Sequence, residues 1–457
     1  MIRYIFLCFA FILISSPATL RAEINTDGRI LDIQQVTSDQ GITAWLVEDH
    51  SLPIIAMRFS FTGAGAAGDP ADKQGLSNMV ATMLDQGAGD YDSQTFQLLL
   101  DDHNITLGFG AGRDDFGGSL KMLRHHQDLA FDLLRLALTK PRFDEEPLER
   151  MRNAALSRIR NSLSNPRWIA ARIMNDTVFD GHPYALNAGG TLQTIGRIDD
   201  AAMRDVVEKR LGRDNLVISI VGAISADEVK DRLDALFGDL PAQAELTPAE
   251  TIKLQNQGKT VLYEHDIPQT IIQIIQPGIA RDDPDYYKAA IMNFILGGSG
   301  FGSRLTEEIR EKRGLTYGIS SGFFNLEHAK AFQISTSTQN DNVADMLTLI
   351  RAEIDMMRDT EPAKEEVADA KAYLIGSLPL RLASTDSIAG LIQNMQLDHL
   401  PPDYLDRRAA KLDAVTVQDV QYIARKMLAP DALTTILVGR PGNITPSVII
   451  ETLPHVE

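Results

Sequence analysis

Two short segments, DNLVISIVG at residues 214–222 and DALTTILVG at residues 431–439, decide how the chain is organised. They share the frame D-x-L-x4-V-G, and each follows an amphipathic helical stretch. The spacing of about two hundred residues is far longer than the repeat of a solenoid protein. The sequence therefore predicts a duplicated domain.

The two halves also open alike. Alternating strands are predicted at residues 42–47 and 53–62 in the first half, and at 260–264 and 269–275 in the second. A helix predicted at 286–296 follows a turn rich in chain breakers. Strands and long helices mix without a regular βαβ rhythm, which favours an α+β fold over a doubly wound parallel sheet.

A polar stretch separates the halves. Residues 241–258 are rich in Gln, Ala, Thr and Glu and lack a clear apolar period, so we interpret them as an interdomain linker. The predicted domains are then residues 23–240 and 259–457.

The first 22 residues are typical of a secretory signal peptide. An apolar run follows Arg3, small and polar residues come next, and cleavage is expected near Ala22. A retained membrane anchor would need roughly 18 uninterrupted apolar residues, and this run is shorter. The mature protein is expected to be periplasmic or secreted, without a membrane span.

Composition narrows the function classes. The chain has 457 residues, of which 44% are apolar and 23% charged, so it can bury a large core. Its one cysteine, Cys8, lies in the signal peptide, which leaves the mature chain without thiol chemistry. Removing Arg3 and Arg21 with that peptide changes the net charge from −18 to −20. Such a charge argues against nucleic acid and anionic membranes as partners.

The second half contains LGGSGFGSRL at residues 296–305, followed by EEIREKRGLTY at 307–317. No Lys-Ser/Thr pair follows the glycines, so the loop is not a phosphate-binding P-loop. Together with GHPY at 181–184 and AKAYLIGS at 370–377, these blocks closely resemble the LGGG-x-x-SRL signature and accompanying motifs of the pitrilysin/insulinase metallopeptidases, the inverzincins.

This resemblance implies a clam-like pair of tandem homologous α+β domains, each with an antiparallel sheet and helices packed on one side. Small members of the family form a peptidase chamber from two such chains. One chain supplies zinc, and the other supplies an arginine and a tyrosine that hold the substrate.

The family's zinc motif is missing from this chain. An inverzincin binds zinc through H-x-x-E-H on a helix, with the glutamate as general base. Aligned on the family's Gly-Leu pair, this sequence has Asn78, Ala81 and Thr82 at the three positions. The later glutamate ligand falls on Arg158. All four substitutions oppose zinc binding, so we expect no cofactor in this chain and zinc in a partner subunit.

No other hydrolytic site is evident from the sequence. HExxH and G-x-S-x-G motifs are absent, and none of the nine histidines lies three or four residues from another. His125 and His126 are adjacent and would point in different directions on a helix, which is typical of a surface pair. His182 belongs to the His-Pro-Tyr block and is expected to fix a turn.

Arg310 and Tyr317 have the seven-residue spacing of the family's substrate-binding pair. A tyrosine hydroxyl can donate to an oxyanion, and a guanidinium can hold a carbonyl or carboxylate through its fork of donors. The alternative is that Tyr317 is a core aromatic on a strand at 315–321 and Arg310 a solvated charge. The neighbouring Arg304 is either solvent-facing or fold-stabilising.

The glycine loop has a possible use of its own. Gly297, Gly298, Gly300 and Gly302 permit positive φ and a close backbone approach, which would admit an extended peptide. The loop resembles the glycine-rich loop of the zinc-less subunit of the mitochondrial processing peptidase. The alternative is a mobile connection without a ligand.

Two functional interpretations remain. The first is a non-catalytic, substrate-binding subunit of a heterodimeric zinc peptidase that acts on unfolded peptides, completed by an HxxEH-bearing partner of the same family. The second is a structural or peptide-binding protein derived from a peptidase, without a proteolytic role. Retention of both Arg310 and Tyr317 favours the first.

Overall fold

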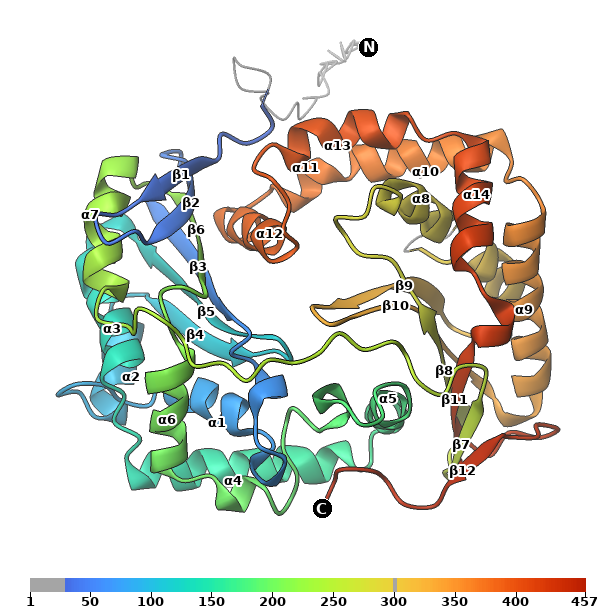
Figure 1. The fold of residues 1–457 in the computed structure, drawn as a ribbon, viewed down its shortest axis with the longest axis horizontal. Coiled ribbons are helices and arrows are strands. Elements are labelled where there is room, and N and C mark those ends of the chain that lie inside the picture. Colours follow the sequence, from blue (N-terminus) through green and yellow to red (C-terminus); the bar gives the residue numbers. More distant parts are fainter. Residues whose placement is uncertain (1–28, 299–301) are drawn as a thin grey trace, which may run out of the picture.

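The computed structural model describes residues 29–298 and 302–457 and contains two six-stranded sheets with flanking helices (Figure 1). The α+β class and the two-domain organisation are thereby confirmed. The predicted signal peptide and Gly300 lie outside the described residues. No helix within the described part has the length and apolar character needed to cross a membrane.

The first sheet has the strand order β1-β2-β6-β3-β5-β4. Its strands are β1 Gln34–Thr37, β2 Thr43–Glu48, β3 Ile54–Thr62, β4 Thr106–Ala111, β5 Asp115–Leu123 and β6 Leu216–Gly222. β6 pairs in parallel with β2 and antiparallel with β3. The sheet is therefore mixed, which corrects the expectation of a purely antiparallel sheet.

The second sheet has the order β12-β7-β11-β8-β10-β9 and repeats this design in five strands, while its edge strand β12 is parallel to β7 and β1 is antiparallel to β2. Its strands are β7 Thr260–Glu264, β8 Gln269–Pro277, β9 Ile319–Leu326, β10 Ala329–Gln339, β11 Thr434–Gly439 and β12 Val448–Ile450. β11 lies parallel to β7 and antiparallel to β8, as β6 does to β2 and β3. The two D-x-L-x4-V-G segments thus form corresponding inner strands.

The glycine that ends each repeated segment has a steric cause. A Cβ atom on Gly222 would lie 2.1 Å from the Ile54 carbonyl oxygen, and one on Gly439 would lie 2.4 Å from Thr270 Oγ1. Both glycines also have positive φ, 134° and 153°. Only glycine fits where the inner strand passes so close to its neighbour.

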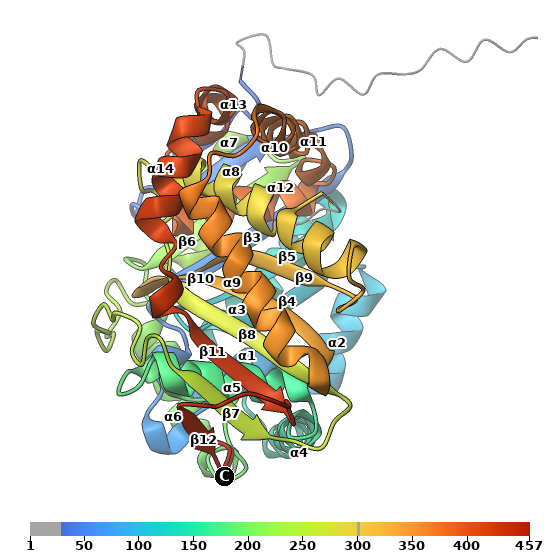
Figure 2. The ribbon, with the colours of Figure 1, turned by 90° about the vertical axis from the view of Figure 1, so that its right-hand side faces the viewer.

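Most helices cover the outer faces of the sheets (Figures 1 and 2). Those of the first half are α1 Leu76–Met83, α2 Ser93–Asp102, α3 Gln127–Thr139, α4 Glu145–Ser162, α5 Pro166–Val178, α6 Asp200–Arg210 and α7 Ala226–Phe237. Those of the second half are α8 Tyr286–Leu296, α9 Val343–Asp359, α10 Lys364–Gly376, α11 Leu378–Arg381, α12 Thr385–Leu397, α13 Tyr404–Asp413 and α14 Val417–Met427.

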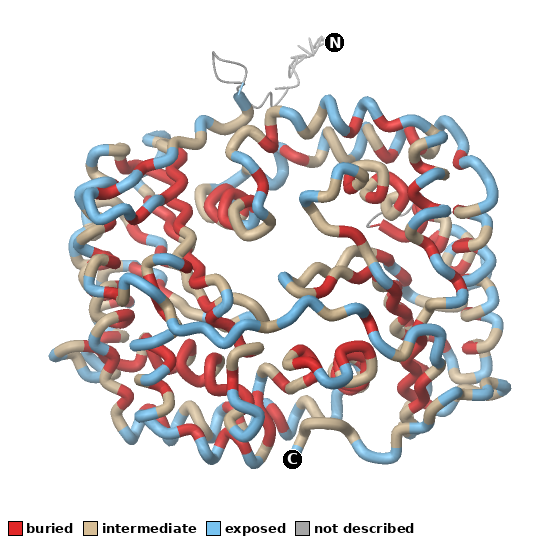
Figure 3. The backbone as a smooth tube through the Cα atoms, viewed as in Figure 1, coloured by how far each residue is buried: buried red, intermediate tan, exposed pale blue. Residues whose placement is uncertain are grey.

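Each sheet is also covered by one helix from the other half. α12 packs Ile388 and Ile392 against Trp45 and Val221 of the first sheet. α5 reciprocally packs its apolar side chains, including Ile173, on the second sheet. Both helices are largely buried (Figure 3). Because each fully buried aliphatic side chain contributes about 2 kcal/mol, these two seams hold the halves together strongly. The expected packing of helices on one side of each sheet holds only within each half. In the whole chain, a helix from the other half covers the second face of each sheet.

Polar contacts converge where the two halves and the linker meet. The Tyr184 hydroxyl donates to the Asp114 carboxylate and accepts from the His328 amide at 3.2 Å. The Glu327 amide, at the tip of the β9–β10 hairpin, also donates to Asp114, at 2.9 Å. In the linker, the Ile252 amide donates to the His328 carbonyl at 2.9 Å. We call this set the interdomain junction.

We expect Tyr184→Phe to lower the free energy of unfolding by about 1 to 3 kcal/mol, because it leaves the partly buried His328 amide without its acceptor. Urea denaturation of the mature chain measures the change. Tyr422→Phe is the matched control, since the Tyr422 side chain is 51% exposed. Equal stability of the two variants would contradict a role for the hydroxyl.

Candidate functional site

The helix that carries the zinc motif in the family corresponds to α1. Gly75 forms its N-cap with a φ of 89°. A Cβ atom there would lie 2.8 Å from the Gly190 Cα atom, so the position requires glycine. This close approach sets α1 against the 187–190 loop and fixes the direction in which its side chains leave the helix.

Three of the four motif positions come together. Asn78, Thr82 and Arg158 line one pocket of about 90 Å³, which we call the degenerate zinc pocket. Ala81 does not line it. The Ala81 residue is 4% exposed and belongs to the core of the first half.

The side chains in this pocket suit hydrogen bonding and not metal binding. Asn78 Nδ2 donates to the Ala188 carbonyl at 2.8 Å, and Thr82 Oγ1 donates to the Met79 carbonyl at 3.0 Å. Arg158, on α4, adds a positive charge. Across residues 29–298 and 302–457, no three His, Cys, Asp or Glu side chains are placed to hold a metal ion.

Arg310 lies on a short π-helix, η6, at Thr306–Glu311. The extra residue in each π turn widens the helix, and such turns are frequent at functional sites. The Arg310 guanidinium is about one-third exposed and lies 3.6 Å from the Glu311 carboxylate. It does not line the degenerate zinc pocket, which is in the other half.

Tyr317 is 91% exposed and sits in the turn that precedes β9. The alternative of a buried aromatic on a strand beginning at Leu315 is therefore wrong. The turn itself is well anchored, because Thr338 Oγ1 donates to the Leu315 carbonyl at 2.7 Å and Thr336 Oγ1 donates to Thr316 Oγ1 at 3.1 Å. An exposed ring on an anchored turn is presented to whatever binds there.

Two of the described loop glycines, Gly297 and Gly298, serve packing. A Cβ on Gly297 would lie 2.6 Å from Ser321 Oγ, and one on Gly298 would lie 2.6 Å from the Phe294 Cα atom. Gly302 is exposed, with open space around it. Gly297 and Gly298 do not have positive φ, and the use of the loop for an extended peptide stays a prediction.

Arg304 stabilises the fold after this loop. Its guanidinium makes two hydrogen bonds of 2.8 Å to the Glu366 carboxylate on α10. The bidentate pair ties the start of the π-helix to α10, so it holds the segment that carries Arg310 in place. Of the two interpretations of Arg304, the fold-stabilising one is confirmed.

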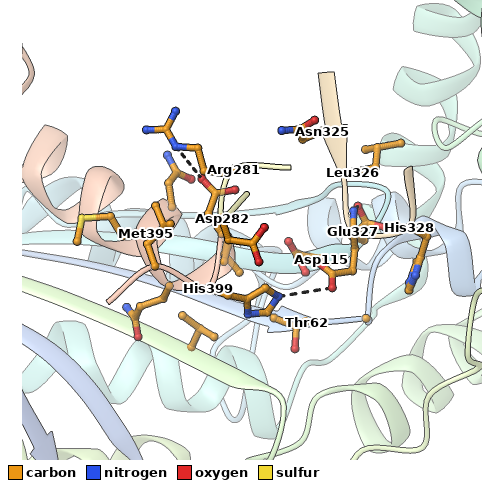
Figure 4. A pocket seen from close by; sticks show the side chains of 18 of the residues that line it. Thr62, Asp115, Arg281, Asp282, Asn325, Leu326, Glu327, His328, Met395 and His399 are labelled. Atoms are coloured by element: carbon orange, nitrogen blue, oxygen red, sulfur yellow. Dashed lines mark hydrogen bonds and ion pairs between the residues drawn. The ribbon is translucent and has the colours of Figure 1, made fainter. Parts of the chain in front are cut away.

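A larger cavity of about 770 Å³ lies between the halves, beside the interdomain junction (Figure 4). Asp115, Asp282 and Glu327 project toward His399 in this view. His399 Nε2 lies 3.5 Å from the Glu327 carboxylate. This cavity could not be predicted from the sequence, because its lining comes from segments of both halves that are far apart in the chain.

The acidic residues in the cavity influence one another. Burial raises the pKa of Asp115 to about 6, and the neighbouring Asp114 and Glu327 add to the effect. A hydrogen bond from the Gly63 amide and the nearby His399 act in the opposite direction. Asp115 is therefore a carboxylate whose charge changes between pH 5 and 7.

The histidines singled out in the sequence have structural settings. His182 Nδ1 accepts from the Tyr184 amide at 3.1 Å, and His182 Nε2 lies 2.9 Å from the Glu250 carbonyl of the linker. His182 therefore fixes a turn, as expected. His125 and His126 lie in a 3₁₀ turn, where their ring centroids are 4.0 Å apart. The expectation that they point in different directions is wrong, because the turn is not an α-helix.

Two family models match the chain. Residues 60–191 match the model described as insulinase (peptidase family M16), and residues 197–374 match the model described as peptidase M16 inactive domain. Together they extend over parts of both halves and include α1, Asn78, Thr82 and Arg158 of the degenerate zinc pocket, Arg310 and Tyr317.

Individual proteins agree with these matches. A Helicobacter pylori protein named as a non-peptidase homolog, YmxG, is 26% identical, covering 86% of this chain and 90% of its own. A Bacillus subtilis protein named as an uncharacterized zinc protease is 22% identical, covering 90% and 99%. The crystal structure of a peptidase M16 inactive domain from Pseudomonas fluorescens superposes with a TM-score of 0.84 at 28% identity, covering 91% of this chain and all of that one.

We expect the purified mature chain to retain no stoichiometric zinc, because Asn78, Thr82 and Arg158 are unsuitable ligands and Ala81 has no donor atom. Elemental analysis after dialysis measures the ratio, with an intact H-x-x-E-H peptidase dialysed in parallel as the control. A ratio near one zinc per chain would overturn the prediction.

We expect Asp115→Asn to stabilise the fold at pH 8 and to have little effect at pH 4. The folded pKa is about 6, against an ordinary 3.8, so the folded state binds more protons than the unfolded chain between these values. The unfolding free energy of the native chain should therefore fall over that range, and the variant should avoid a loss of about 1 to 3 kcal/mol.

Urea denaturation at the two pH values measures this difference. Asp239→Asn, at an exposed position, is the control. An Asp115→Asn advantage that is the same at pH 4 and pH 8 would show that the carboxylate charge is not responsible.

Proposed function

Because the chain belongs to the insulinase family of metallopeptidases, peptidase family M16, we propose that it is a non-catalytic, substrate-binding subunit of a heterodimeric zinc peptidase. Its partner is a family member with an intact H-x-x-E-H motif and the zinc ion. This chain supplies Arg310 and Tyr317 to the partner's active site, and the substrates are peptides or unfolded proteins.

The exposure of Tyr317 carries the proposal. A large aromatic side chain that is 91% exposed, on a turn held by hydrogen bonds to β10, contributes little to the stability of its own chain. Solvent-exposed aromatic residues are enriched where proteins bind partners. Arg310 lies seven residues earlier, on the same connection into β9.

The chemistry of the pair suits the far side of a peptide bond from a zinc ion. A tyrosine hydroxyl donates to the carbonyl oxygen as that oxygen becomes an oxyanion. One such donor contributes on the order of 3 kcal/mol to transition-state stabilisation, or roughly a hundredfold or more in rate. An arginine fork holds a backbone carbonyl or carboxylate in the ground state as well.

Peptide binding also needs main-chain partners, and the sheets offer them. β4 and β9 each end a sheet, so one side of each strand is not paired with another strand of its sheet. An extended peptide can add to such an edge through backbone hydrogen bonds. β9 begins two residues after Tyr317, so a peptide on that edge would pass beside the tyrosine.

The setting is the periplasm or the exterior of the cell, after cleavage of the signal peptide near Ala22. We expect the partner to be exported in the same way. A neighbouring gene that encodes a signal peptide and an intact H-x-x-E-H motif would identify it. A structural or peptide-binding role without proteolysis is the rival. A purely structural role has no use for an exposed Tyr317 seven residues after Arg310.

We expect Tyr317→Phe to reduce turnover by the mixed complex about a hundredfold, mostly in kcat, because a donor that acts in the transition state is lost. Folding and assembly should be unchanged, since the side chain is almost fully exposed. Arg310→Ala should also raise KM, because a guanidinium that grips the peptide acts before the transition state. Cleavage of an unstructured peptide by the chain and its partner measures both.

Tyr422→Phe is the matched control for loss of an exposed tyrosine hydroxyl. Size-exclusion chromatography reports whether each variant still assembles. Wild-type rates in both Tyr317→Phe and Arg310→Ala, with the complex intact, would leave the structural role as the better account.

A further inference from the structure

The degenerate zinc pocket has a charge opposite to that of a metal site. Twelve residues line it, and Arg158 is the only ionisable one among them. The remaining lining is neutral, namely Gly75, Asn78, Met79, Thr82, Ala155, Ile159, Ser162, Trp168, Asn187, Gly189 and Ile195. A pocket that holds a dication in a peptidase therefore carries a single positive side chain here, in a chain whose net charge is −18.

The positive charge is not used inside the fold. Within the part of the chain that the structure describes, the guanidinium of the exposed Arg158 makes no ion pair and no hydrogen bond. Arg150 and Arg152, on the same helix, pair with Glu146 and Glu149. The Arg158 guanidinium thus keeps its donors available on the pocket lining.

A second donor group lies on the same lining. Trp168, near the start of α5, lines the pocket, and its indole N–H, which can only donate, has no protein acceptor among the described residues. Asn165 caps this end of α5 by accepting from the Arg167 and Trp168 amides at 3.0 and 3.3 Å. The cap holds the backbone that carries the indole.

The space matches a small planar anion. A volume of about 90 Å³ corresponds to several water molecules, since a single one needs roughly 10 to 15 Å³ by the same measure. A carboxylate group fits, and a guanidinium binds a carboxylate through two parallel hydrogen bonds.

We propose that the degenerate zinc pocket is a carboxylate-binding site, in which Arg158 and Trp168 receive the carboxylate of a linear peptide. That carboxylate is either the peptide's C-terminus or an Asp or Glu side chain, since both present the same group. Replacement of the family's zinc ligands would thus turn a site that cleaves peptides into one that binds a peptide carboxylate.

The test measures peptide binding to the full mature chain by fluorescence anisotropy. Three labelled, unstructured peptides of one sequence are compared: a free C-terminal acid, its amide, and an amide with one internal Gln replaced by Glu. We expect the acid to bind at least tenfold more tightly than the plain amide, with the advantage reduced at high salt. Tight binding of the Glu-containing amide instead would assign the site to acidic side chains.

Arg158→Gln should remove the advantage of the acid and leave binding of the plain amide unchanged. Arg158→Lys keeps the charge but not the fork, so it should restore only part of the advantage. Arg160→Gln is the matched control, because Arg160 is exposed on the same helix but does not line the pocket. Circular dichroism confirms that each variant is folded.

Gly189→Phe provides an independent obstruction. Gly189 is exposed, and a Cβ there meets only Asn187 Oδ1, at an ordinary 3.5 Å, so a side chain can be added without strain. The phenyl ring should block the pocket and weaken binding of the free-acid peptide as much as Arg158→Gln does. Equal binding of acid and amide by the native chain, or equal losses in Arg158→Gln and Arg160→Gln, would overturn the proposal.

This inference does not depend on the proposed function. Binding is measured on the chain alone, whereas the subunit role is measured as turnover by the mixed complex. If the native chain binds acid and amide equally and the mixed complex turns over normally, only the carboxylate site is rejected. If the chain prefers the acid but Tyr317→Phe and Arg310→Ala leave turnover unchanged, only the subunit role is rejected.

Discussion

The two halves, joined by the apolar seams of α5 and α12, also share one buried hydroxyl that restricts their relative position. Tyr184 donates to Asp114 of the first half and accepts from the amide of His328 in the second, so a single group satisfies polar atoms from both. His182, two residues earlier, lies 2.9 Å from the Glu250 carbonyl and ties the linker to the same point. Polar atoms in such a place are costly when unpaired, and this cost selects one relative position of the halves. The wall of the large cavity, including the hairpin tip at Glu327, follows from that position.

Much of the fold could be predicted because short sequence patterns determine its strands and helices. The repeated D-x-L-x4-V-G frame identified the inner strands β6 and β11, and the helix predicted at 286–296 coincides with α8. The reciprocal covering of the sheets by α5 and α12 could not be predicted. An apolar period shows that a helix buries one face, but it does not show which sheet receives that face. The parallel pairing of β6 with β2 was missed for the same reason, since pairing partners are not encoded locally.

Some residues of the candidate sites could also be predicted from the sequence, and others could not. The family pattern located Asn78, Thr82 and Arg158, and the structure brings them to one pocket. Ala81 differs because its environment is the core, where a glutamate would place a carboxylate among apolar side chains. The exposure of Tyr317 was not visible in the sequence, because a tyrosine near a strand is ordinarily half-buried. Asp115 was missed altogether, since its raised pKa arises from groups that only the tertiary fold assembles.

The exchange of α5 and α12 constrains how such a chain can be divided. Cutting at the linker would not yield two independent domains, because each sheet would lose the helix that covers its inner face and would expose Trp45 and Val221, or Ile275 and Ile436, to water. Two identical half-chains could cover each other in the same way as a symmetric pair. The present molecule has the topology that such a pair would acquire once a linker joined its subunits, with the two-fold relation retained in five strands of each sheet and broken at the edge strands β1 and β12.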